Sequence, residues 1–499
     1  MNIGIIGSGI SGSTVLRTLI KSNLFNQNSD SIHVFDKRPI NGRGMAYQED
    51  NLSLKLNTGE NFLSVKLDER SDFSHFLNTN YPNWDDGEGL IPRIYFGNYL
   101  EDRFAEYYNH PLVHKHQENI VDVAVEKNTT NDFPYVYRLK NEAGKWFEET
   151  FDAVFFAIGH APYSDYYDLG HSDKFIRDPY PMQESLNWIT DDLRVGIIGS
   201  GATAFDLLRY FEDHYALHYP LTFYVRGNPF SSTGVRLDEG NAQMTIDDEW
   251  MAKQKALHGD KIPLNTILEQ VEADFKNNAI DWHSLVREFG SGQLSENIRV
   301  HETQPQALAY LANYFEQITT FLPDLYQSIT AEDKARFLLD YAPYVEHFRS
   351  PVPPGTMERI KQMLIQDRLR IVSGLSQIKT QSDGAFMVYT DDKFKETTDV
   401  LINATGFDNN LSHAGDKQPL ITSLYNKEII MPAYDGEDVV VTWPQTQVVN
   451  NKQGVLENAF FLGNYISHTQ YANNNAQLMV KQAVRTADDF IEKVRGMNK

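Results

Sequence analysis

The first twelve residues constrain the fold more strongly than any other stretch of the chain. An apolar run from Asn2 to Ile6 leads directly into a turn that contains Gly7, Gly9 and Gly12. In a strand–loop–helix unit of this kind, the first glycine permits the tight turn, the second lets the backbone approach a pyrophosphate, and the third lets the helix pack closely on the strand. The unpaired amides at the start of the helix attract negative charge. We therefore predict a unit that binds a dinucleotide.

The residues after this turn support that interpretation. Apolar residues between Ile10 and Ile20 follow a helical period, and Ser31 to Phe35 reads as a second strand that ends at Asp36. Asp36 follows the loop at about the 20-residue spacing at which an acid accepts hydrogen bonds from a ribose 2′-hydroxyl. The alternative is an ordinary strand–helix–strand unit whose glycines serve only packing.

The same motif is repeated in the middle of the chain. A predicted strand from Arg194 to Ile198 is followed by Gly199-Ser-Gly-Ala, with Ala204 in place of the third glycine, which the motif allows. The next strand ends at Arg226, where the first unit has an acid. An arginine here can pair with a 2′-phosphate, so this unit favours NADPH, with NADH still possible. The alternative for Arg226 is a solvated arginine at a strand end.

Composition excludes several classes of protein. The 499 residues allow two or three domains, and 68 acidic against 45 basic residues give a net charge of −23, which repels nucleic acid and anionic lipid. No cysteine is present, which excludes disulfides, thiolate nucleophiles and iron–sulfur clusters. The first strand leaves no room for a signal peptide, and no apolar run approaches the roughly 20 residues of a membrane span. We expect a cytoplasmic protein without a membrane or nucleic-acid partner; no oligomeric state is indicated.

The rest of the chain continues the α/β pattern around a helical stretch. Apolar segments from Phe151, Val400 and Ala459 read as buried strands that end at Gly159, Gly406 and Gly463. We predict an α/β fold with two Rossmann-like dinucleotide-binding domains and a helical insertion. Residues 1–185 and 386–499 form the first domain, and residues 186–385 form the second, with the insertion at about 247–369.

Two loops carry candidate side chains. Arg43 stands between glycines, which suggests a backbone pressed against a flat or charged group, although an ordinary surface loop is the alternative. His347 and Arg349 lie in a proline-stiffened segment that runs to Pro354. They are candidates for holding an anionic substrate or the nicotinamide cofactor, and a structural histidine is the alternative for His347. No histidine and carboxylate residues stand at metal-ligand spacing, so we expect no metal site.

These segments in this order resemble the two-dinucleotide flavoproteins. The resemblance is to the bacterial FAD/NAD(P)-binding protein family and, more distantly, to the flavin-containing and amine N-hydroxylating monooxygenases. The sequence from Gly42 to Tyr47, with Leu56 and Asn57, resembles that family after its FAD-binding acid, and His347 to Pro351 resembles its proline-containing motif. Both ends and the middle of the chain are covered, but little of the helical insertion.

The resemblance implies a set of contacts with FAD and NADPH. The residues expected to bind the cofactors are Gly7, Gly9, Ser11, Gly12, Asp36, Lys37, Arg43, Gly44, Tyr47, Asn57, Gly159, Gly199, Gly201, Ala202, Arg226, Thr405, Gly406, Gly463 and Asn464. Many relatives have an acid at the position of Asn464, which carries no charge but can still accept a hydrogen bond from a ribityl hydroxyl.

The two expected cofactors indicate an oxidoreductase. With FAD and NADPH bound, the cofactors supply the redox chemistry and the protein positions them. We favour a monooxygenase that uses dioxygen to hydroxylate a small molecule through a flavin peroxide, which needs no protein nucleophile. A reductase or dehydrogenase without oxygen insertion, and a non-enzymatic redox-sensing protein, are the alternatives.

Overall fold

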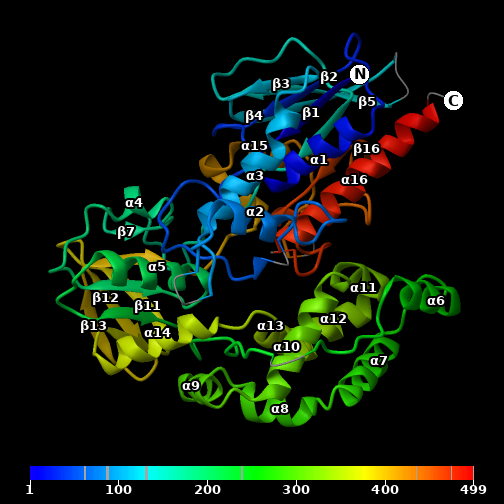
Figure 1. The fold of residues 1–499 in the computed structure, drawn as a ribbon. Coiled ribbons are helices and arrows are strands. Elements are labelled where there is room, and N and C mark those ends of the chain that lie inside the picture. The colour runs from blue at the N-terminus through cyan, green and yellow to red at the C-terminus, as the bar shows by residue number, and fades with distance from the viewer. Residues whose placement is uncertain are drawn as a thin grey trace.

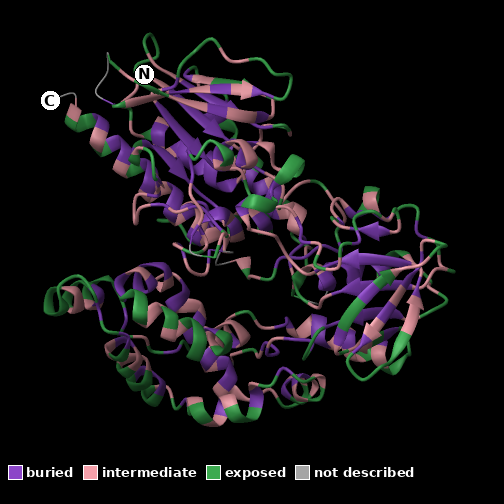
Figure 2. Cartoon of the chain, turned by 180° about the vertical axis from the view of Figure 1, so that it is seen from behind, coloured by how far each residue is buried: buried purple, intermediate pink, exposed green. Residues whose placement is uncertain are grey.

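The computed structural model describes residues 1–60, 63–85, 89–129, 133–237, 240–433, 435–473 and 475–497. Figure 1 shows three regions: a sheet with helices that holds both chain ends, a second sheet with its own helices, and a group of helices beside them. Buried residues follow the strands of both sheets, while the outer surfaces of the helices are exposed (Figure 2). Within the described ranges, no helix is both long enough and apolar enough to cross a bilayer.

The first sheet combines the two ends of the chain. Its strand order is β15-β16-β6-β1-β2-β3, and all neighbours are parallel except β15 and β16. The strands are β1 (Asn2–Ile6), β2 (Ser31–Phe35), β3 (Val113–His116), β6 (Ala153–Phe156), β15 (Gln447–Asn450) and β16 (Gly454–Phe461). Because β16 pairs with β6, residues near the carboxyl terminus complete the unit that the amino terminus begins.

Both faces of this sheet are covered, because successive strand residues point to opposite sides. Ile3, Ile5 and Val34 contact the helical side, and Ile6 and Phe156 contact the other. The helical side is formed by α1 (Ile10–Lys21), α2 (Asp72–Asn80), α3 (Arg93–Tyr108) and α16 (Ala476–Met497). The opposite side is formed by the hairpin of β4 (Ile120–Lys127) and β5 (Tyr135–Asn141), by α15 (Pro419–Asn426), and by the short turns η2 (Leu411–His413) and η3 (Gly415–Lys417).

The second sheet is entirely parallel, in the order β10-β9-β8-β14-β7. Its strands are β7 (Phe175–Ile176), β8 (Val195–Ile198), β9 (Leu221–Tyr224), β10 (Leu369–Val372) and β14 (Val400–Asn403). The helices α4 (Met182–Ser185), α5 (Ala202–His214) and α14 (Pro354–Ile365) pack in this region, whose other face meets the antiparallel sheet of β11 (Leu375–Thr380), β12 (Phe386–Thr390) and β13 (Lys395–Thr398).

Both predicted domain boundaries differ from this arrangement. The boundary at residue 185 assigns β7 to the first domain, but β7 pairs with β14 of the second sheet. A boundary at residue 385 assigns residues 386–403 to the first domain, but β14 pairs with β8 and β7 of the second sheet. The apolar sequence of β14 indicates a buried parallel strand without specifying its sheet. Along the chain, the antiparallel strands β11 to β13 connect β10 to β14.

The third region is helical and lies between β9 and β10 in the sequence. Its helices are α6 (Asp248–His258), α7 (Leu264–Asn277), α8 (Trp282–Phe289), α9 (Leu294–Thr303), α10 (Gln306–Thr319), α11 (Leu322–Ser328), α12 (Ala331–Asp340) and α13 (Ala342–Arg349). Apolar residues at helical spacing, such as Leu308, Leu311 and Phe315 of α10, form its own core. The predicted insertion at about 247–369 corresponds to this region together with α14.

A buried carboxylate joins the first two regions. Asp206 of α5 is 1% exposed, and its Oδ2 accepts hydrogen bonds from the Arg93 guanidinium of α3 at 2.6 Å and from the Tyr180 hydroxyl at 2.8 Å. Its Oδ1 accepts from the backbone amide of Lys55 at 3.4 Å and lies 3.6 Å from Arg209. Burial alone would lower the pKa of Arg93, but the Asp206 charge raises it above its ordinary value. The Arg93 guanidinium therefore stays charged across the neutral range.

We expect Asp206→Asn to lower the free energy of unfolding by about 3 kcal/mol, because it leaves the Arg93 guanidinium buried without its counter-ion. Chemical denaturation followed by circular dichroism measures the loss. Asp102→Asn is the matched control, because Asp102 pairs with Arg103 on the exposed side of α3, where an ion pair contributes at most about 1 kcal/mol. Equal losses in the two variants would contradict a joining role for Asp206.

Candidate functional site

The first glycine loop has the packing geometry that the sequence predicts. Gly7 has a φ of +104°, and a Cβ on it would lie 2.1 Å from the Ala157 carbonyl oxygen. A Cβ on Gly12 would lie 2.0 Å from the Gly7 carbonyl oxygen, so both positions require glycine. Gly9 differs, because a Cβ there would meet only the Cα of Gly44 at 3.5 Å, an ordinary contact. The protein's own packing therefore does not require glycine at position 9.

Asp36 and Lys37 follow β2 beside this loop. The buried Asp36 carboxylate accepts hydrogen bonds from the backbone amide and hydroxyl of Ser8 at 2.9 and 3.0 Å, and from the Arg38 amide at 3.0 Å. Asp36 and Lys37 also line a cavity of about 90 Å³ together with Gly7. The acid thus holds the glycine loop in place and borders a space next to it. Ser11, in the first turn of α1, is buried within the same unit.

The segment around Arg43 packs against the first loop. A Cβ on Gly44 would lie 2.7 Å from the Cα of Gly9, so the two glycines are in direct contact. Arg43 is buried, and its Nε donates to the Glu101 carboxylate of α3 at 2.8 Å. An ordinary surface loop, which the sequence left open, is therefore not observed. The Arg43 guanidinium is held inside the protein by α3.

The second glycine loop repeats the geometry of the first. Gly199 has a φ of +108°, and a Cβ on it would lie 2.6 Å from the Ala404 carbonyl oxygen. Gly201 precedes α5 and faces open space, as no atom lies within 4 Å of the position of a Cβ. Ala202 is the first residue of α5. Arg226, exposed after β9, has its guanidinium 5.7 Å from the ring centre of Tyr166. Arg226 and the ring of Tyr166 therefore lie together at the position predicted for the 2′-phosphate of NADPH.

The remaining predicted strand-end residues divide between the two loops. Gly159 and Gly463 lie together near the first loop, since a Cβ on Gly463 would be 3.5 Å from the Gly159 carbonyl oxygen. Asn464 begins the short turn η4 (Asn464–Ile466) that comes next. Thr405 and Gly406 instead follow β14, beside Gly199 of the second loop. The Thr405 hydroxyl is hydrogen-bonded to the Asn403 side chain at 2.7 Å.

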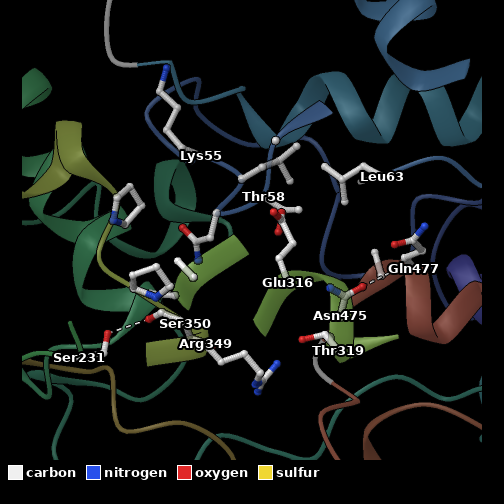
Figure 3. Close-up of a pocket in the computed structure, with 18 of the residues that line it drawn as sticks. Lys55, Thr58, Leu63, Ser231, Glu316, Thr319, Arg349, Ser350, Asn475 and Gln477 are labelled. Carbon is white, nitrogen blue, oxygen red and sulfur yellow. Dashed lines mark hydrogen bonds between the residues drawn. The ribbon is translucent and has the colours of Figure 1, made fainter. Parts of the chain in front are cut away.

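One cavity of about 890 Å³ opens where the three regions meet (Figure 3). Of the predicted residues, Tyr47, Asn57, Gly201, Ala202 and Arg349 line it. The other lining residues are Ala46, Lys55, Leu56, Thr58, Gly59, Leu63, Arg93, Ser200, Phe205, Pro229, Ser231, Val235, Leu237, Ala309, Ala312, Asn313, Glu316, Thr319, Thr320, Ser350, Pro351, Pro353, Asn475, Ala476, Gln477 and Leu478. The cavity therefore joins the loop after the first unit, the second glycine loop, α10 and the start of α16.

The two candidate substrate residues separate in the structure. Residues 346–349 form the last turn of α13 and not a loop, because the prolines begin only at Pro351. His347 Nε2 lies 2.8 Å from the Phe289 carbonyl oxygen, and burial lowers the pKa of the ring, so His347 is a structural residue outside the cavity lining. Arg349 does line the cavity, and its guanidinium donates to the Glu346 carboxylate at 2.6 Å.

Sequence reasoning missed several residues of the cavity, of which Glu316 is chemically the most unusual. It stands on α10, and burial raises its pKa to about 7. The signal available in the sequence was an acid on the polar face of an amphipathic helix, which is usually solvated. Asn475, also missed, caps α16, because its side-chain oxygen accepts from the Gln477 amide at 2.8 Å.

The arrangement fits two bound dinucleotides. At Gly159, Gly201 and Gly406 a Cβ would meet no atom within 4 Å, so the backbone at these strand and loop ends faces open space. Gly9 is likewise not required by the protein's own packing. Each loop also precedes a helix, whose amino terminus favours phosphate. Among the described residues, no group of three or more histidine or acidic side chains is placed to hold a metal ion.

Sequence comparison finds that the first third of the chain is similar to a known family. The model of the FAD-NAD(P)-binding family matches residues 4–161, which hold the first glycine loop, Asp36 and the Arg43 segment. No curated protein matches the sequence significantly.

Several solved structures share the fold of the whole chain. The reduced ornithine hydroxylase of Pseudomonas aeruginosa is 12% identical, with a TM-score of 0.62 over 99% of both chains. The L-lysine 6-monooxygenase of Pseudomonas syringae is 14% identical, with a TM-score of 0.59 over 98% of this chain and 99% of its own. The ornithine N-hydroxylase of Kutzneria sp. 744, with reduced FAD, NADP⁺ and L-ornithine, is 12% identical, with a TM-score of 0.52 over 99% of both chains. The resemblance to FAD/NAD(P)-binding proteins is thus confirmed over residues 4–161, and the predicted α/β fold with two dinucleotide-binding units over the whole chain.

Proposed function

We propose that this chain is an FAD- and NADPH-dependent monooxygenase that hydroxylates a small molecule. The observation that carries the proposal is the cavity of about 890 Å³, which residues of both nucleotide units line. Its walls include Tyr47 and Asn57 of the first unit and Gly201 of the second. A volume of this size exceeds what one ring system fills, and ligand pockets of about 300–1,000 Å³ are typical of enzymes. The cavity therefore has room for the reacting ends of two cofactors and a substrate.

Each unit supplies a distinct set of contacts. Gly7, Gly9 and Gly12 would hold the pyrophosphate of FAD, with Asp36 beside its ribose. Gly199, Gly201 and Ala202 would hold that of NADPH. Arg226, with Tyr166 beneath it, would take the 2′-phosphate. Bound FAD would supply the redox chemistry by accepting hydride from NADPH and then reacting with dioxygen.

The protein's own part in this reaction is positioning and exclusion of water. The helical region covers the cavity through α10, while α16 directs its amino terminus, capped by Asn475, at the same space. The solved structures that share the fold include proteins named as an ornithine hydroxylase, a lysine 6-monooxygenase and a cyclohexanone monooxygenase. These names support oxygen insertion over simple flavin reduction.

We also infer a cytoplasmic enzyme without a nucleic-acid partner. The net charge of −23 repels polyanions, and a chain without cysteine needs no oxidising compartment for its fold.

Anaerobic NADPH should bleach the flavin of the purified protein, and readmitted ¹⁸O₂ should place one labelled oxygen in a product when amines, sulfides or ketones are supplied. Stopped-flow absorbance measures the first step and mass spectrometry the second. Reoxidation that yields only hydrogen peroxide with every compound would support a reductase instead. A flavin that neither NADPH nor NADH bleaches would support a redox-sensing role.

Arg226→Ala should raise the KM for NADPH by about 10- to 100-fold and leave the KM for NADH nearly unchanged, because only NADPH has the 2′-phosphate. The magnitude follows from the about 1.5–3 kcal/mol that a hydrogen bond between charged groups contributes. Steady-state flavin reduction measures both constants. Arg368→Ala is the matched control, because Arg368 precedes β10 at the opposite end of the same parallel sheet. Equal losses for the two nucleotides would remove Arg226 from the phosphate site.

Gly9→Ala should weaken FAD binding, whereas Gly12→Ala should lower the stability of the protein. A Cβ at Gly9 has room in the protein, so this variant should fold normally and bind FAD about 10-fold or more weakly. A Cβ at Gly12 would collide with the Gly7 carbonyl, so that variant should lose stability even without FAD. Thermal unfolding of the flavin-free proteins and FAD titration separate the two effects. Full FAD affinity in Gly9→Ala would remove Gly9 from the site.

A further inference from the structure

The side of α10 that faces the cavity differs from its apolar side. Leu311, Phe315 and Ile318 pack into the helical core, whereas Ala312 and Glu316 line the cavity. The small side chains of Ala309 and Ala312, on the turns before Glu316, leave space around its carboxylate. The helix thus presents one acid to the space that both nucleotide units share.

Glu316 is the only acid among the described residues that line this cavity. No hydrogen bond or ion pair to its carboxylate is found among the described residues, although Glu316 is partly buried. The other titratable or charged side chains of the lining are Tyr47, Lys55, Arg93 and Arg349. Arg93 is paired with Asp206 and Arg349 with Glu346, each at 2.6 Å. The cavity's arginines are thus engaged by acids other than Glu316.

The directions of the side chains agree with this separation. In Figure 3 the Glu316 carboxylate points toward Thr58 across the cavity, whereas the charged ends of Lys55 and Arg349 point away from it. Burial raises the pKa of Glu316 to about 7, which is the expected response of a carboxyl group removed from water without a nearby cation. The site therefore requires a positive partner that the described residues do not supply.

A bound cation with N–H donors would meet this requirement. A partly buried carboxylate without a partner loses part of its hydration, and a charge-assisted hydrogen bond from an ammonium group offsets that loss. The phosphates of both cofactors are anionic, and the charged ring nitrogen of oxidised nicotinamide has no N–H to donate. Among the expected occupants of the cavity, the substrate is left to carry the cation.

We propose that Glu316 is the residue that selects and positions the substrate, by binding a protonated amino group. The identity of this ligand as the substrate rests on the proposed monooxygenase function; the ammonium site itself rests on the cavity. The ammonium is held by α10, opposite the loop that contains Thr58. Alcohols of the same length are neutral and carboxylates are anionic. Both lack the positive charge that the site requires, so both bind more weakly.

This role has a defined pH dependence. The free carboxyl group titrates near pH 7, so Glu316 is increasingly ionised as the pH rises from 6 to 8. An alkylammonium group with a pKa of about 10 stays protonated over that range. Ammonium binding should therefore strengthen as the pH rises through 7 and should then level off. A variant with glutamine at this position should show no such rise.

The test uses the full-length, FAD-loaded protein and calorimetric binding of n-pentylammonium, 1-pentanol and pentanoate. At pH 8 we expect the native protein to bind n-pentylammonium about 10-fold or more tightly than 1-pentanol or pentanoate. Glu316→Gln should abolish this preference, and it should also abolish the increase in n-pentylammonium affinity between pH 6 and pH 8. Glu316→Asp should retain part of the preference. Glu269→Gln is the matched control, because Glu269 is an exposed acid of α7 outside the cavity.

Stability gives a second readout. Glu316→Gln removes a poorly solvated charge, so its thermal unfolding midpoint should equal or exceed that of the native protein. Equal binding of the three probes by the native protein, or an unchanged preference in Glu316→Gln, would overturn the proposal. Ammonium selectivity without NADPH-driven flavin reduction would overturn the proposed function and leave the ammonium site in place. A Glu316→Gln variant that loses NADP⁺ affinity and keeps the ammonium preference would reassign Glu316 to the cofactor.

Discussion

The buried Asp206 carboxylate is the contact on which the rest of the site depends. It belongs to α5, which comes after the second glycine loop, yet it binds Arg93 of α3 and the backbone of Lys55 in the first unit. Arg93 and Lys55 both line the large cavity. An ion pair between the buried Asp206 and the partly buried Arg93 thus links one wall of the cavity to the other.

The two nucleotide units are built alike because they solve the same packing problem. In each, the first glycine of the loop lies against the carbonyl of a neighbouring strand end, Gly7 against Ala157 and Gly199 against Ala404. Only glycine fits these contacts, and each leaves the next helix pointing its amino terminus at open space. The units differ in the residue at the end of the second strand, which is Asp36 in the first unit and Arg226 in the second. Because of this difference in charge, we assign FAD to the first unit and NADPH to the second.

The helical region turns a two-cofactor scaffold into a selective site. Its helix α10 buries apolar residues such as Phe315 on one side and directs Glu316 into the cavity on the other. A carboxylate in this position lowers stability unless a cation arrives, which is how binding sites commonly exchange stability for function. The cofactors set the type of reaction, and the charge on α10 is proposed to set which molecules undergo it.

The sequence by itself determined the local elements: both strand–glycine–helix units, the strands that end at Gly159 and Gly406, and the helical insertion. These elements can be predicted from the spacing of apolar residues and from the positions of the glycines, which are local properties of the chain. Only the tertiary structure decided that β14 joins the second sheet, that His347 stays outside the cavity while Arg349 lines it, and that Glu316 also lines it. Strand partners and the burial of a polar helix face depend on contacts between segments far apart in the chain, and no local pattern encodes them.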